Sequence, residues 1–275
     1  MNILESILYG ILSGVSRFLP ISSSGHQQLF KYIMGVTTPT PIADLFIHIA
    51  LLLALIFSNS TYLERLNRER ISRSGNSRTT KRIDVAASYD NRLLQTATIS
   101  LIVLFFVLSF LHGHFTKIAP LALCFLLNGI ALYFPEHLPH GDKDSRKTST
   151  LDSLIIGLSG ALSILPGLSC VGLCLTAAVC RGADKSKAIG WVFVISIPAI
   201  LCCIVLDFIT MFTAGVGVVS FVIIIGYILS ALFAFVFAII GISVLRYIIS
   251  RSDFTGLAFY SWGAAILCFI LYLTA

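Results

Sequence analysis

Charged residues are scarce in this chain. Only 12% of its 275 residues are Asp, Glu, Lys or Arg, whereas an average soluble domain carries about 25%. Hydrophobic residues make up 57% of the chain, and the mean hydropathy is +0.93. Because so few charges cannot cover the surface of a soluble domain, the composition predicts a multi-pass membrane protein.

Cysteine pairs of the C-x-x-C type are absent, and so is a basic segment before the first apolar stretch. All seven cysteines lie inside apolar stretches, which is typical of small buried residues rather than of a zinc or redox centre. The start, Met1-Asn2-Ile3, resembles no signal peptide. We therefore expect the first apolar stretch to remain in the mature protein.

Long apolar runs recur along the whole chain. Crossing a bilayer takes roughly 20 apolar residues, and six segments approach or exceed this length: 42–58, 93–112, 119–134, 188–211, 218–245 and 255–275. Two further apolar stretches, 3–30 and 151–180, are interrupted by Pro, Gly and Ser clusters. Irregular backbone at membrane depth needs protein or water to satisfy its polar groups. The prediction is an all-α polytopic protein, a single membrane domain over 1–275, with six transmembrane helices and two re-entrant hairpins.

Basic residues gather on one predicted face. Four segments on that face hold 16 of the 19 Lys and Arg: 61–92, 135–150, 181–187 and 246–253. The loops predicted on the other face contribute only Lys117. This asymmetry follows the positive-inside rule and places the basic segments in the cytoplasm. It indicates contact with anionic membrane lipids rather than with nucleic acid. The stretch 60–92 has no clear periodicity, and we interpret it as a cytoplasmic loop.

The two interrupted stretches are related to each other. A shift of 146 positions gives seven identities in 16 positions between 8–23 and 154–169, including Ser13-Gly14 on Ser159-Gly160. Under the predicted sidedness the two stretches enter from opposite faces, which makes an inverted repeat of about 1–134 and 151–275. Paired interrupted segments of this kind indicate a binding site near the midplane.

Polar side chains concentrate in the interrupted stretches. The first contains Arg17, three consecutive serines (Ser22, Ser23, Ser24) and His26, and the second contains Gly167 and Ser169. Intramembrane polar residues are expensive and mark functional sites, and helix ends can present N–H groups to an anion. We expect a phosphate or carboxylate site here; the alternative is that the hydroxyls only satisfy the kinked backbone. His48, alone in the span that follows, is a weaker candidate.

The motifs resemble those of the bacterial undecaprenyl-diphosphate phosphatases, the bacitracin-resistance family. Residues 10–26, ending in Phe18-Leu19-Pro20-Ile21-Ser22-Ser23-Ser24-Gly25-His26, are similar to the family's first motif, G-I-x-E-G-x-T-E-F-L-P-I-S-S-T-G-H. Residues 165–172 resemble its second motif, I-P-G-x-S-R-S-G, and 193–200 resemble F-L-L-S-I-P-A-I. The resemblance implies a bacterial inner-membrane protein that acts on a polyprenyl diphosphate in cell-wall lipid recycling. It assigns Ser23 as nucleophile and His26 as the essential histidine.

This chain departs from those motifs at the residues that are expected to carry the chemistry. The two motif glutamates are Ser13 and Arg17, the motif arginine is Cys170, and the serine after it is Val171. Carboxylates would hold a divalent metal or act as base, and an arginine stabilises charge on the transferring phosphoryl group. We therefore expect no cofactor, a lost metal site and impaired hydrolysis. Arg17 would replace the missing arginine, binding an anion with Ser22, Ser23, Ser24, Gly167 and Ser169.

Three functions remain open from the sequence. The first is binding, with or without translocation, of a polyprenyl phosphate or diphosphate at the midplane site. The second is an active undecaprenyl-diphosphate phosphatase using Ser23 and His26. The third is transport of another anionic amphipathic substrate. The expected partners are membrane lipids. A homodimer with a second copy of the chain is a further possibility.

Overall fold

The computed structural model describes residues 1–37, 40–74, 84–139, 141–214, 220–251 and 254–274. Over these residues the protein is helical and has no strand beyond one isolated bridge between Lys143 and Ala183. The all-α prediction is confirmed. Three predicted basic-loop residues, Arg78, Lys81 and Arg82, lie outside the described residues.

Within the described ranges, six helical segments are long and apolar enough to cross a membrane. Their main helices are α3 (Pro41–Ser58), α5 (Val85–Leu108), α7 (Ile118–Tyr133), α10 (Lys185–Ala214), α11 (Phe221–Ser250) and α12 (Thr255–Thr274). Short turns extend two of them: η1 (Ser109–Leu111), α6 (His112–Phe115) and η2 (Phe134–His137). These segments correspond to the six predicted spans.

Helix α5 starts earlier than the predicted residue 93. The Asp84 side chain caps it by accepting a hydrogen bond from the N–H of Ala87, at 3.0 Å. Asp90 in the second turn is buried, and its carboxylate accepts hydrogen bonds from Tyr62 and from the indole of Trp191. Partners outside the segment thus allow polar residues inside this helix, which hydropathy alone could not predict.

The segment expected to be an unpatterned loop contains a helix, α4 (Ser60–Ser74). Its buried residues are Leu66 and Glu69, and Glu69 accepts a hydrogen bond of 2.7 Å from Ser88 in α5. Arg65 donates two hydrogen bonds to Asp84, and these hold the pKa of that carboxyl below its usual range. The contact between α4 and α5 is therefore largely polar, so it leaves no hydrophobic period in the sequence.

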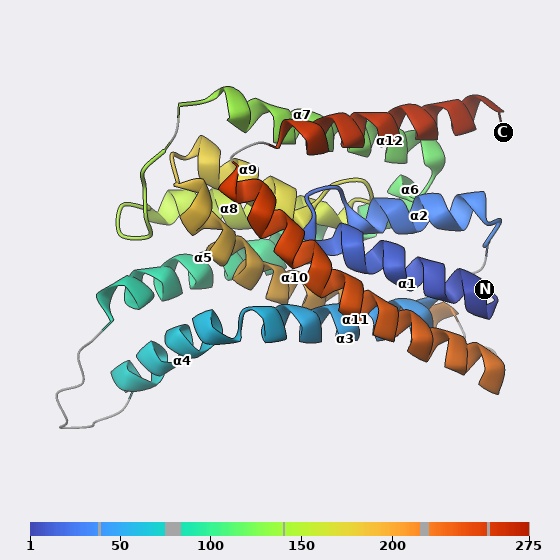
Figure 1. Ribbon diagram of the computed structural model, residues 1–275, viewed down its shortest axis with the longest axis horizontal. Helices are drawn as coiled ribbons and strands as arrows, with labels where there is room; N and C mark the ends of the chain where they lie inside the picture. Colours follow the sequence, from blue (N-terminus) through green and yellow to red (C-terminus); the bar gives the residue numbers. More distant parts are fainter. Residues whose placement is uncertain (38–39, 75–83, 140, 215–219, 252–253, 275) are drawn as a thin grey trace.

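Two helical hairpins approach the middle of the molecule from opposite ends (Figure 1). The first is α1 (Ile3–Phe18) with α2 (Ser23–Ile33), and the second is α8 (Thr150–Ala161) and η3 (Leu162–Ile164) with α9 (Cys170–Cys180). Both α1 and α8 begin with a capping box, formed by Asn2 with Glu5 and by Ser149 with Asp152. This arrangement is compatible with the predicted re-entrant hairpins.

The helix pairing is the one that an inverted repeat requires. Helix α1 packs against α11 and α8 packs against α5, while α3 packs against α10 and α7 against α12. Glycine allows close contact between α1 and α11 and between α8 and α5. Gly10 lies over the Ser230 carbonyl, and Gly157 lies over the Ala97 carbonyl. The helix pairing is compatible with two related halves of opposite orientation.

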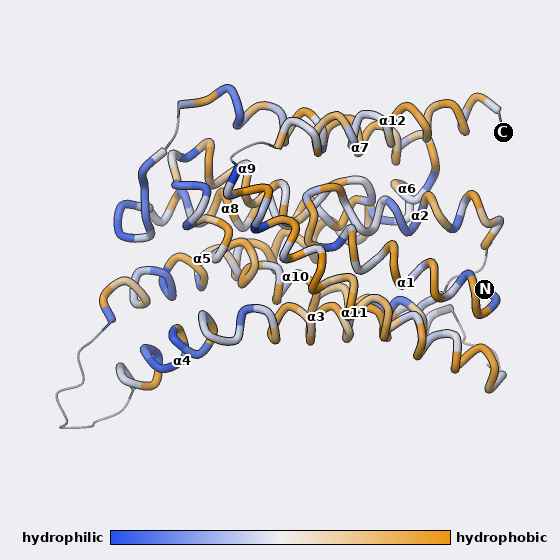
Figure 2. The backbone as a smooth tube through the Cα atoms, in the orientation of Figure 1, coloured by the Kyte–Doolittle hydropathy of each residue, from blue (hydrophilic) through white to orange (hydrophobic). Residues whose placement is uncertain are grey.

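Hydropathy divides the molecule along its long axis. Figure 2 shows apolar residues along the central helices, whereas hydrophilic residues gather at the end that carries α4 and the connection between α7 and α8. Both chain termini lie at the opposite end (Figure 1). The basic segments therefore lie at one end of the bundle.

Candidate functional site

The tips of the two hairpins contact each other directly. The Ser22 hydroxyl accepts hydrogen bonds from the backbone N–H of Gly25, at 3.2 Å, and of Gly167, at 3.1 Å. A Cβ on Gly25 would lie 2.8 Å from the Gly167 backbone, so only glycine allows this approach. Two distant segments of the chain therefore meet in one buried core, as the predicted site requires.

Asn128 in α7 holds the two tips together. Its amide nitrogen donates to the Pro20 carbonyl at 2.9 Å and to the Ser261 hydroxyl at 3.1 Å. Its amide oxygen accepts from the Ser169 N–H at 2.9 Å. One fully buried side chain thus satisfies backbone groups of both hairpins.

Two of the predicted site serines cap helices. Ser22 caps α2 through Gly25, and Ser169 caps α9 by accepting from the Gly172 N–H at 3.2 Å. Ser22 has a φ of +70°, an unfavourable conformation for a residue with a side chain, and such strain concentrates at functional sites. Both hydroxyls are buried and engaged with the backbone.

A cavity of about 610 Å³ lies beside the hairpin tips. Its rim includes residues of the connections after α2 and α5, at the end of the molecule opposite α4 (Figure 1). Its inner polar lining comes from both hairpins and from α3 and α10: Arg17, Ser24, Gln27, Gln28, Lys31, Asp44, His48, Ser163 and Asp207. Of the predicted site residues, Arg17, Ser24 and the weaker candidate His48 line this cavity.

Arg17 supplies a positive charge to the cavity that no carboxylate balances within the described residues. Its guanidinium lies beside the Cys203 thiol and interacts electrostatically with Cys170. The other cavity cation, Lys31, is paired with Asp44 at 3.0 Å. Because an unbalanced charge at membrane depth is costly, this arrangement favours an anionic ligand near Arg17.

Ser23 and His26 lie at the hairpin junction but are not among the cavity's lining residues. Ser23 Oγ donates to the Ser13 carbonyl at 3.3 Å. His26 Nδ1 is 2.6 Å from the Ser22 carbonyl oxygen, and its Nε2 is 2.8 Å from the Tyr260 hydroxyl in α12. The imidazole also stacks on the Tyr260 ring. Both ring nitrogens of His26 are therefore engaged, Nδ1 at the start of α2 and Nε2 toward α12.

Besides the pair of Lys31 and Asp44, a second hydrogen-bonded pair lies on the cavity wall. His48 Nδ1 in α3 is 2.6 Å from Asp207 Oδ2 in α10, and the two side chains are 11% and 14% exposed. Asp44 accepts from Tyr9 and Thr40 in addition to Lys31. The cavity thus combines a cation, an oriented imidazole and carboxylates.

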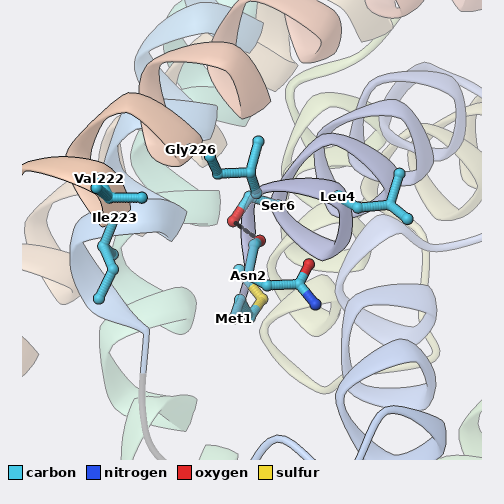
Figure 3. Close-up of a pocket in the computed structure, with 8 residues that line it drawn as sticks. Met1, Asn2, Leu4, Ser6, Val222, Ile223 and Gly226 are labelled. Carbon is cyan, nitrogen blue, oxygen red and sulfur yellow. Dashed lines mark hydrogen bonds between the residues drawn. The ribbon is translucent and has the colours of Figure 1, made fainter.

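A smaller cavity, of about 370 Å³, lies where the start of α1 meets the start of α11 (Figure 3). It is lined by Met1, Ile3, Leu4, Val222, Ile223 and a few small or polar residues. The Ser6 hydroxyl in this cavity donates to the Asn2 carbonyl. No Lys, Arg, His, Asp or Glu side chain is in its lining.

Comparison with known families identifies the scaffold. The sequence profile of the family described as bacitracin resistance protein BacA matches residues 6–267, almost the whole chain. The chain belongs to the BacA family. The resemblance read from the motifs is confirmed.

Several curated relatives match along nearly their whole length. The undecaprenyl-diphosphatase 3 of Bacillus cereus is 29% identical over 275 residues, covering 100% of this chain and 99% of its own. The undecaprenyl-diphosphatases of Halothermothrix orenii and Desulforapulum autotrophicum are 27% and 26% identical, each covering 98% of both chains. The similarity to these relatives therefore extends over nearly the whole of this chain.

Of the four positions predicted to depart from the family motifs, Ser13, Cys170 and Val171 are buried, and Arg17 is partly buried. Ser13 Oγ donates to the Tyr9 carbonyl at 2.6 Å and accepts from Gln27 at 2.9 Å. Cys170 and Val171 pack in the hydrophobic core at the start of α9. Only Arg17 among the substituted positions lines the cavity.

The donor set at these motif positions does not fit a divalent metal ion. Ser13 offers a hydroxyl already bonded on both sides, and Arg17 is positively charged. Throughout the described part of the chain, no three or more His, Cys, Asp or Glu side chains cluster in a way that could hold a metal.

Sequence reasoning did not single out Asn128, Asp207 or Tyr260. Asn128 and Asp207 each stand as a polar residue within an apolar span, a signal that could have identified them. Tyr260 carries no such signal, because its role depends on the position of His26.

Proposed function

We propose that this protein binds the head group of a polyprenyl phosphate or diphosphate in the cavity beside the hairpin tips, with hydrolysis impaired relative to its relatives. The observation that carries this proposal is Arg17, a cation on the cavity wall with no carboxylate partner among the described residues. The names of the relatives supply the substrate class, a polyprenyl diphosphate.

The polar lining of the cavity suits a phosphate head group. Arg17 offers a planar, bidentate donor, which is the preferred partner of a phosphate. Ser24, Gln27 and Gln28 add neutral donors on the same wall. The isoprenoid chain would stay in the bilayer, so only the charged end needs the polar groups of the cavity.

Impaired hydrolysis follows from the substituted positions. The family carboxylates are absent, Ser23 Oγ is bonded to the Ser13 carbonyl, and both His26 nitrogens are engaged. Phosphoryl transfer depends on positioning and charge stabilisation, and losing one such contribution typically slows it by about 10²-fold or more.

The proposed location is the bacterial plasma membrane with the basic segments in the cytoplasm. Charge asymmetry supports this orientation. The cavity rim then lies on the outer side, because it is at the end of the molecule opposite α4. A lipid carrier would be bound from the outer leaflet.

The binding proposal is tested by replacing Arg17 with alanine. A charge-assisted hydrogen bond contributes about 1.5–3 kcal/mol, so Arg17→Ala should weaken binding of a non-hydrolysable prenyl bisphosphonate by roughly 10- to 150-fold. Binding is measured with purified protein in detergent. Lys117→Ala, which removes an exposed cation that does not line the cavity, should bind like the wild type. Undiminished binding by Arg17→Ala would remove the proposal.

The second candidate is an active undecaprenyl-diphosphate phosphatase, favoured by the imidazole–carboxylate pair of His48 and Asp207 on the same cavity wall as Arg17. Phosphate release from undecaprenyl diphosphate, measured with and without Mg²⁺ or Ca²⁺, separates the two functions. Turnover as fast as that of a family relative, lost in Ser23→Ala or His26→Ala, would replace impaired hydrolysis with a working enzyme of the family type.

A further inference from the structure

The pair formed by His48 and Asp207 joins the two halves of the molecule across the cavity wall. His48 lies in α3 and Asp207 in α10, the helices that pack against each other at the centre of the two halves. Their side chains are 159 positions apart in sequence, yet His48 Nδ1 and Asp207 Oδ2 are 2.6 Å apart. Both residues line the cavity that Arg17 also lines.

The hydrogen bond determines which ring nitrogen can react. With Nδ1–H donated to the carboxylate, the lone pair of a neutral imidazole is on Nε2. His48 Nε2 makes no hydrogen bond to any residue that the structure describes. A histidine whose Nδ1 is held by a carboxylate and whose Nε2 is open has the geometry of a general base.

His26, the family histidine, is arranged differently. Its Nε2 is 2.8 Å from the Tyr260 hydroxyl and its Nδ1 is 2.6 Å from a backbone carbonyl. Its ring packs between Tyr260 and Phe125. Of the two histidines, His48 is the one that lines the cavity, and its Nε2 has no hydrogen bond to a described residue.

We propose that His48 is the general base for hydrolysis of a prenyl diphosphate in this cavity, with Asp207 as its positioning residue. This inference rests on the proposed binding of such a lipid beside Arg17. His48 Nε2 takes a proton from a water molecule while the water oxygen bonds to the terminal phosphorus. The bond from that phosphorus to the bridging oxygen breaks, leaving inorganic phosphate and the prenyl monophosphate. The proton then passes from His48 to bulk water.

The charges around the pair suit this step. Arg17 balances the negative charge that develops on the bridging oxygen as it leaves the terminal phosphorus. Lys31 is held by Asp44, so its charge is already balanced, and Asp207 keeps the imidazolium stable once it forms. The step needs no carboxylate at the two substituted motif positions, Ser13 and Arg17.

The competing interpretation is that His48 and Asp207 only tie α3 to α10. The variant His48→Asn separates the two, because an asparagine amide can still donate to Asp207 but has no basic nitrogen. A general base contributes about 10²- to 10⁴-fold. We expect His48→Asn to lower kcat for phosphate release from undecaprenyl diphosphate at least 100-fold. Its binding of the non-hydrolysable prenyl bisphosphonate should stay within about three-fold of the wild type. The matched control is His114→Asn, since His114 is exposed and away from the cavity lining.

A double-mutant cycle tests the role of Asp207. If Asp207 acts through His48, Asp207→Asn should lower kcat about ten-fold or more in the wild-type background and have little further effect in His48→Asn. Equal effects in both backgrounds would show that Asp207 acts independently of His48, and would overturn its assignment as a positioning residue.

The outcomes distinguish this inference from the proposed function. Wild-type protein that binds the bisphosphonate but releases no phosphate from the diphosphate would overturn the base and leave the binding proposal standing. Full turnover in His48→Asn together with lost turnover in Ser23→Ala would also overturn it, in favour of the family nucleophile. Wild-type protein that binds no bisphosphonate would remove the proposed function and this inference with it.

Discussion

Arg17 stands in the last turn of α1, at a position where the motif comparison predicts that a family glutamate has been replaced. On the other hairpin, Cys170 is predicted to stand where the family motif has an arginine, and it is buried at the start of α9. The two predicted substitutions would together move a positive charge from one hairpin to the other. At the residue scale, the prediction is that Arg17 keeps an anion site where a family carboxylate has been lost.

Asn128 is the residue on which the geometry of the site depends most. Asn128→Ala would leave the Pro20 carbonyl and the Ser169 N–H buried without partners, at a cost of about 1–3 kcal/mol for each group. We expect thermal unfolding in detergent about 5 °C lower or more, and weaker bisphosphonate binding. The control Asn67→Ala changes an exposed side chain and should unfold like the wild type. An Asn128→Ala protein as stable as the wild type would show that the tips hold together without this amide.

At the scale of elements, the site is made by two interrupted helices rather than by any one motif. Each hairpin leaves free N–H groups where it turns, and these are satisfied by serine hydroxyls of either hairpin. Gly25 and Gly167 allow the turns to touch, and Gly167 has a φ of +101°. Contact between the tips requires small residues at these two positions because any side chain would separate the backbones.

Gly25→Ala tests that contact. The added Cβ would lie 2.6 Å from the Phe125 ring and 2.8 Å from the Gly167 backbone, and such overpacking typically costs about 1–3 kcal/mol. We expect a lower unfolding temperature and a loss of bisphosphonate binding. The matched control is Gly263→Ala in α12, where no atom lies within 4 Å of the new Cβ. The control should be neutral or stabilising by about 0.5–1 kcal/mol. Equal behaviour of the two variants would contradict tight packing of the tips.

At the scale of the whole molecule, the basic end and the cavity rim lie at opposite ends of the bundle. The positive-inside rule then predicts that the cavity rim lies on the outer side of the membrane. A lipid diphosphate reaching Arg17 would come from that side.

Thiol labelling tests this orientation. In a Cys180→Ser background, a membrane-impermeant maleimide added to intact spheroplasts should label Lys117→Cys but not Asp142→Cys, because the two exposed positions lie on opposite sides. Inside-out vesicles should give the reverse pattern. Labelling of Asp142→Cys in intact spheroplasts would place the basic end outside and the cavity inside.

Much of this architecture was predictable because the bilayer sets simple requirements. Apolar length predicted the six spans, and the Pro, Gly and Ser clusters predicted the two interruptions, since unpaired backbone at membrane depth is rare. Helix α4 was missed because its contact with α5 is made by polar residues such as Glu69 and Ser88. Whether the predicted serines and His26 bind or react with a ligand stays a prediction.

The sequence by itself determined that this is a helical membrane protein of the BacA family. Those features are local: they follow from apolar length, charge distribution and motif spacing. Only the tertiary structure decided which polar side chains line the cavity. His26 is held by Tyr260, 234 positions away, and His48 by Asp207, 159 positions away. A side chain takes its direction from its hydrogen-bond partner, and that partner is known only when distant helices have been placed together.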